Sequence, residues 1–102
     1  PSNSIIISSS LRSAMSSLLK SYSLENLKKD ITVINIAPGP FKTKRVKELV
    51  KDIDKFEKSL PSGKIGNPDE IGKFVRFIAQ EKIKYITGST VYFDGNINKS
   101  FI

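Results

Sequence analysis

Apolar residues recur at three- and four-residue spacings in several stretches of the chain, and this periodicity predicts amphipathic helices. The helices cover about residues 11–28, 42–60 and 68–81. Between the first two lies an apolar run rich in β-branched side chains, at residues 31–36, which is typical of a strand buried on both faces. The pattern therefore predicts an α/β protein that is organised around this strand.

Turn-forming residues divide these elements. The Pro-Gly-Pro at 38–40 ends the buried strand, and a strand that breaks in this way marks the edge where open α/β sheets bind ligands. Asn67 is expected to cap the third helix, with Pro68 at the first helical position and Glu70 reaching back to the cap. A last strand is predicted at residues 89–93.

The two ends of the chain carry weaker signals. Residues 5–7 favour a short strand or an extended arm, and the serines at 8–10 offer hydroxyls that could cap the first helix. Residues 98–102 form a tail whose final apolar side chains need a partner surface. Because the chain begins with Pro1 and has its single methionine at Met15, we expect a fragment or a processed product of a longer protein.

The composition excludes several classes of function. The chain carries 17 basic and 10 acidic residues, a net charge of +7, but the lysines alternate with acids, as on the solvated face of a helix, and no nucleic-acid-binding signature accompanies them. The absence of cysteine and histidine excludes disulfides, thiolate nucleophiles, histidine-based triads and ordinary zinc sites, so no metal is expected. With no apolar run of about 18 residues and no signal peptide, we expect a soluble, cytoplasmic protein that binds neither nucleic acid nor membrane.

Three segments together resemble one family. Residues 31–43 contain Ile-Thr-Val, then Asn35, then Pro-Gly-x-x-x-Thr; residues 63–71 read GKIGNPDEI; and residues 85–95 read YITGSTVYFDG. In this order and spacing they resemble the C-terminal part of the short-chain dehydrogenase/reductases, in particular 3-oxoacyl carrier-protein reductases. The resemblance implies the C-terminal portion of a Rossmann-type doubly wound fold, with two parallel strands and about three helices, as a single partial domain over residues 1–102.

The resemblance also places two residues at the family's catalytic positions. Ser8 aligns with the tyrosine, and Arg12 with the lysine, of the family's Tyr-x-x-x-Lys motif. A serine hydroxyl is too weak an acid to replace the tyrosine as general acid, whereas arginine can still hydrogen-bond a ribose or a phosphate. Alternatively, Ser8 is only a helix cap and Arg12 only a surface residue of the first turn.

The same resemblance implies contacts with a nicotinamide cofactor. Pro38 and Gly39 would approach the nicotinamide ring, Gly39 because it has no Cβ, and Thr43 would contact the same end of the cofactor. The glycine-rich phosphate loop of a dinucleotide site is missing from the 102 residues. We therefore expect NAD or NADP to bind the parent protein, and no cofactor to bind this chain alone.

Two functions remain open. The first is a fragment of an NAD(P)-dependent oxidoreductase that acts on a carbonyl or secondary alcohol, such as a 3-oxoacyl thioester or a sugar. The second is a catalytically dead oligomerisation or interaction module derived from that family. In both cases the expected partners are the missing N-terminal half and a second copy of the chain, which would bind through about residues 68–95.

Overall fold

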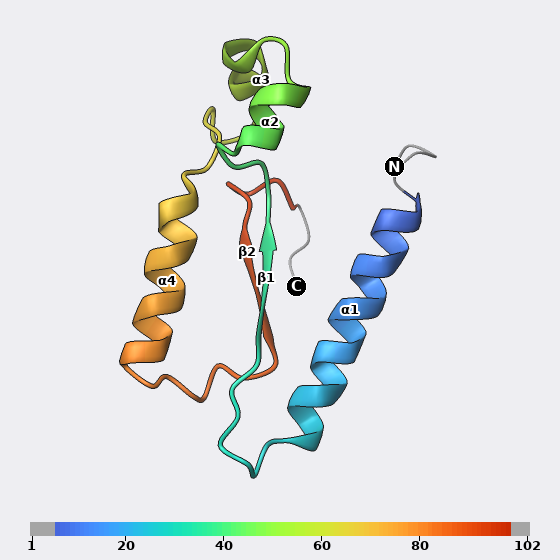
Figure 1. The fold of residues 1–102 in the computed structure, drawn as a ribbon, viewed down its shortest axis with the longest axis vertical. Coiled ribbons are helices and arrows are strands. Elements are labelled where there is room, and N and C mark those ends of the chain that lie inside the picture. Colours follow the sequence, from blue (N-terminus) through green and yellow to red (C-terminus); the bar gives the residue numbers. More distant parts are fainter. Residues whose placement is uncertain (1–5, 99–102) are drawn as a thin grey trace. The chain divides into compact units, whose positions relative to one another are not determined.

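The computed structural model describes residues 6–98 of the chain (Figure 1). Its elements follow in the order α1 (Ile6–Glu25), β1 (Ile34–Pro38), α2 (Lys44–Leu49), α3 (Ile53–Ser59), α4 (Pro68–Gln80) and β2 (Ser89–Phe93). The two strands pair in parallel, joined by a helical crossover, so the predicted partial α/β fold is confirmed.

The chain divides into two compact units. The first contains residues 1–35 and 84–90, and the second contains residues 36–83 and 91–102, so each strand begins in one unit and ends in the other. Backbone hydrogen bonds mark both ends of the strand pair. Gly88 N donates to Val33 O at 2.7 Å in the first unit, and Gly39 N donates to Phe93 O at 2.8 Å in the second.

Helix α1 begins earlier than the sequence predicts. It starts at Ile6, so Ile6 and Ile7 are helical rather than extended, and Ser8 to Ser10 lie inside the first turns instead of capping them. Ile5 and the tail residues 99–102 lie outside the described residues. The end at Glu25 has a local cause: Ser23 and Asn26 are buried and donate their side-chain hydrogens to the carbonyls of Lys20 and Tyr22.

The apolar stripe of α1 is exposed. Its side chains recur one helical turn apart, and more than half of the surface of each of Leu11, Met15 and Leu18 is accessible. The serine-bearing face instead contacts the strands, where Asn35 Nδ2 donates to Ser16 Oγ at 3.2 Å. An exposed apolar face of this kind favours association with further structure.

Residues 42–60 form two helices rather than the single one that the periodicity predicts. Val50 ends α2 in an extended conformation, and Asp52 begins α3 by accepting a hydrogen bond from Lys55 N at 3.1 Å. An aspartate at this position competes for the backbone and favours a new helix start over continuation. The interruption was therefore visible in the residue type but not in the apolar spacing.

The rest of the second unit follows the sequence closely. Asn67 caps α4 by accepting from Asp69 N, and Pro68 occupies the first turn, as predicted. Phe74 of α4 packs edge-on against Phe93 of β2, with ring centroids 5.2 Å apart. The buried strand is less buried than predicted, because every residue of β1 retains partial exposure.

Candidate functional site

The loop that follows β1 carries three of the predicted cofactor-binding residues. Pro38 is the last residue of the strand, Gly39 follows it, and Thr43 immediately precedes α2. A Cβ on Gly39 would lie 2.8 Å from Asp94 Cα and 2.9 Å from Asp94 Cβ, closer than such atoms can approach. Gly39 is therefore required by its packing against β2, in addition to the approach of a ligand that the sequence suggested.

Thr43 has a structural task as well. Its Oγ1 accepts a hydrogen bond from Val46 N at 3.3 Å and so caps α2. A hydroxyl has one donor hydrogen and two acceptor positions, so a capping threonine can still donate to a ligand. The side chain is exposed, which leaves that hydrogen accessible.

Backbone hydrogen bonds next to this loop join the two ends of the segment 42–65. Lys42 N donates to Gly66 O and Gly66 N donates to Pro40 O, both at 2.9 Å. Phe41 and Ile65 flank this bridge and are the buried apolar side chains among the described residues. The α2–α3 segment thus begins and ends at one hydrogen-bonded point within the second unit.

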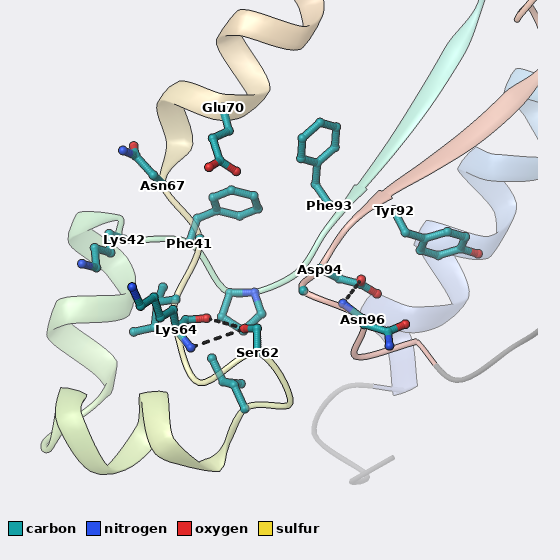
Figure 2. A pocket seen from close by; sticks show the side chains of 15 residues that line it. Phe41, Lys42, Ser62, Lys64, Asn67, Glu70, Tyr92, Phe93, Asp94 and Asn96 are labelled. Carbon is teal, nitrogen blue, oxygen red and sulfur yellow. Dashed lines mark hydrogen bonds between the residues drawn. The ribbon is translucent and has the colours of Figure 1, made fainter.

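A cavity of about 530 Å³ opens beside that point, at the carboxyl ends of both strands (Figure 2). Its volume lies in the range of small-molecule sites. It combines aromatic rings with polar and charged groups, and it is lined by Pro40, Phe41, Lys42, Leu60, Ser62, Lys64, Ile65, Gly66, Asn67, Glu70, Tyr92, Phe93, Asp94, Gly95 and Asn96. The predicted residues Pro38, Gly39 and Thr43 flank this lining without belonging to it.

The other two predicted site residues lie on α1. Ser8 and Arg12 are both exposed and one helical turn apart, and neither side chain has a hydrogen-bonding partner within residues 6–98. They belong to the first compact unit, whereas Pro38, Gly39 and Thr43 belong to the second. The structure thus brings the three loop residues together, and pairs Ser8 with Arg12 on one helix.

Sequence reasoning gave no role to two polar residues that organise these surroundings. Asn35 points from β1 to Ser16 and to Thr90 Oγ1, and it lines a cavity of about 280 Å³ within the first unit. Asp94 follows β2 and binds two backbone N–H groups of the next turn. The position of Asp94 before Gly95-Asn96 was a usable signal, since aspartate in a turn commonly bonds the backbone two residues on.

The residues present fit one end of a dinucleotide. The Thr43 hydroxyl can donate to a nicotinamide carboxamide, while Gly39 N is already engaged by Phe93 O. In residues 6–98 there is no cluster of three or more metal-ligating side chains. Nor does any helix in this part of the chain have the length and apolar character needed to span a membrane.

Comparison with known proteins identifies the family. A family model described as enoyl-(acyl carrier protein) reductase matches residues 5–98. The chain therefore belongs to the short-chain dehydrogenase/reductase family, as the three motifs predicted.

Individual relatives and a solved structure support the same family. The 3-oxoacyl-[acyl-carrier-protein] reductase of Buchnera aphidicola is 37% identical over 90 residues, which are 87% of this chain and 37% of that protein. The acetoacetyl-CoA reductase of Shinella zoogloeoides is 35% identical over 78 residues, 74% of this chain and 32% of that protein. The crystal structure of an NADPH-dependent reductase involved in bacilysin biosynthesis superposes with a TM-score of 0.84 at 26% identity, covering 98% of this chain and 42% of that one. The chain thus spans well under half the length of each.

Proposed function

We propose that this chain is the C-terminal part of an NAD(P)-dependent oxidoreductase that interconverts a carbonyl and a secondary alcohol. The observation that carries the proposal is the loop from Pro38 to Thr43, which leaves the carboxyl end of a parallel strand beside a cavity of about 530 Å³. Ligands of open α/β sheets bind at this edge. Membership in a family of dehydrogenases and reductases supports the same reading.

Three of the five predicted site residues have a side-chain role in this proposal. Thr43 would donate its free hydroxyl hydrogen to the nicotinamide end of the cofactor, which supplies or accepts the hydride when bound. Arg12 would hydrogen-bond a ribose or phosphate, because its guanidinium keeps a fixed positive charge. Ser8 would occupy the position of the proton donor, where its hydroxyl is a poor acid.

The substrate is proposed to be a 3-oxoacyl thioester, with a sugar as the second choice. The names of the carrier-protein and coenzyme A reductases among the relatives support the thioester. Residues 42–64 are also rich in lysine and arginine, which suits an anionic carrier group. The choice between NAD and NADP would be set by residues in the missing half.

The proposed partners are that N-terminal half and a second copy of the chain. The free edge of β1 and the exposed apolar stripe of α1 support docking of further structure. Helix α4 and β2 supply aromatic side chains for contact between copies, since Phe77 and Tyr92 are both more than half exposed. The cytoplasm is the proposed compartment.

The second candidate, a catalytically dead interaction module, is favoured by Ser8. No acidic side chain of suitable pKa replaces the family tyrosine at that position. An assay of the parent protein separates the two functions. Oxidation of NADH or NADPH is followed with acetoacetyl thioester and, separately, with a keto sugar. We expect slow oxidation that requires the thioester; complete inactivity of folded protein towards both substrates would favour the module.

A further inference from the structure

The turn after β2 depends on the carboxylate of Asp94. Its Oδ1 accepts a hydrogen bond from Asn96 N at 2.9 Å (Figure 2). Its Oδ2 accepts one from Asn98 N, also at 2.9 Å. The backbone oxygen of the same residue accepts from Ile97 N at 3.3 Å. One residue therefore binds three of the backbone N–H groups in the turn.

The backbone conformation of the turn is one that few residue types adopt. Gly95 and Asn96 both have positive φ, at 61° and 68°. Glycine and asparagine are the residue types that adopt this left-handed region most readily, so both residues suit the turn. Hydrogen bonds to a charged acceptor are stronger than those between neutral groups, so the Asp94 carboxylate can hold the turn in place.

The turn at residues 94–98 also contacts the Pro38–Thr43 loop of the candidate site. Only glycine fits at position 39, because the backbone and Cβ of Asp94 occupy the space that a side chain would need. Gly39 N also donates a hydrogen bond at 2.8 Å to the carbonyl oxygen of Phe93, the residue that precedes Asp94. Gly39 is thus held by a hydrogen bond from one side and by close packing on Asp94 from the other.

We propose that Asp94 is a positioning residue for the candidate site: its carboxylate fixes the turn at 94–98, and this turn seats Gly39 and thereby the whole Pro38–Thr43 loop. The consequence for cofactor binding rests on the proposed function. The positioning itself does not, because it concerns contacts within the second compact unit.

Hydrogen exchange of backbone amides in the ¹⁵N-labelled 102-residue chain tests this inference without any cofactor. Asp94→Ala removes both acceptors and should speed exchange at the Gly39 amide by at least about tenfold, because the loss of a single charge-assisted hydrogen bond already has an effect of this size. Asp94→Asn keeps one carbonyl oxygen and should restore part of the protection. Asp54→Ala is the matched control, since Asp54 is an exposed aspartate whose side chain makes no hydrogen bond within residues 6–98.

The Val75 amide, in the middle of α4, reports on general unfolding. Unchanged exchange at Val75 together with faster exchange at Gly39 supports the inference. Unchanged exchange at Gly39 in Asp94→Ala overturns it, as does equal acceleration at Val75. Should Asp94→Ala not fold, an Asn variant with full wild-type protection at Gly39 and at the Asn96 and Asn98 amides would also overturn it. A parent protein that binds no cofactor would refute the proposed function and leave this result standing.

Discussion

At the scale of single residues, the chemistry of the proposed site depends on Ser8 and Arg12. Hydride transfer to a carbonyl requires a proton at the oxygen, and general acid catalysis contributes about 10²–10⁴-fold to such steps. An ionisable group serves well only when its pKa lies near the working pH, and a serine hydroxyl is far from that range. In the proposed function Arg12 binds the cofactor, so Ser8 and Arg12 would affect different steps.

We therefore predict that the double variant Ser8→Tyr with Arg12→Lys raises turnover in the parent protein. The increase should appear in kcat, up to about 100-fold, because Ser8→Tyr restores the proton donor while Arg12→Lys keeps the positive charge that binds the cofactor. Steady-state kinetics with NAD(P)H and a thioester substrate measure it, and Ser9→Tyr, which places the ring one position along α1, is the control. Ordinary turnover in the wild type that survives Ser8→Ala would show that the proton comes from another group.

At the scale of elements, α4 is the strongest candidate for contact between copies. Phe74 faces β2, but Phe77 lies three residues further along the helix and is 56% exposed. Buried aromatic residues at the centre of an interface dominate its binding energy, often by 2 kcal/mol or more, roughly a 30-fold change in affinity. The helix thus packs one aromatic side chain on the sheet and leaves another exposed.

Phe77→Glu is accordingly predicted to weaken self-association of the 102-residue chain by at least about tenfold. Sedimentation velocity across a concentration series gives the dissociation constant. Gln80→Glu introduces the same charge at an exposed position of the same helix and should have little effect. If Leu18→Glu abolishes association while Phe77→Glu does not, the contact lies on α1 instead.

The elements also show what the sequence can predict. The N-cap of α4 at Asn67 and the bounds of β2 follow from local residue types, and both were predicted correctly. The predicted return of Glu70 to the cap is not confirmed, because its side chain accepts no hydrogen bond from Asn67 N within residues 6–98. The break at Val50 was missed because apolar spacing continues through it, and only the capping preference of Asp52 interrupts the helix. The start of α1 was missed because serines, which commonly cap helices, lie inside this one.

The candidate site likewise has one part that local sequence predicts and one part that depends on tertiary contacts. The loop 38–43 was found from its Pro-Gly and from its family motif, and local sequence suffices for both. The packing of Asp94 on Gly39 joins positions 55 residues apart in sequence, and the turn residue alone does not reveal which loop it will contact. The bridge of Phe41 with Gly66 is likewise a tertiary contact without a periodic signal.

At the scale of the whole molecule, we propose that this chain contributes only one end of a dinucleotide site. It spans 32–42% of the length of the three relatives compared above. Pyrophosphate binding to a helix N-terminus and a glycine-rich loop contributes a large share of cofactor affinity in such folds, and this chain has no such loop. Affinity for NAD(P)H should therefore appear only when an N-terminal half is supplied.

Calorimetric titration of NADPH and NADH tests this claim most directly. The samples are the 102-residue chain alone and a chimera in which the part of the Buchnera aphidicola reductase that precedes the matched region is fused to it, each first shown to unfold cooperatively. We predict no measurable binding to the chain, micromolar binding of one cofactor to the chimera, and a marked loss of that binding in the chimera with Arg12→Ala. Micromolar binding to the isolated chain, or a folded chimera that binds neither cofactor, would contradict the account.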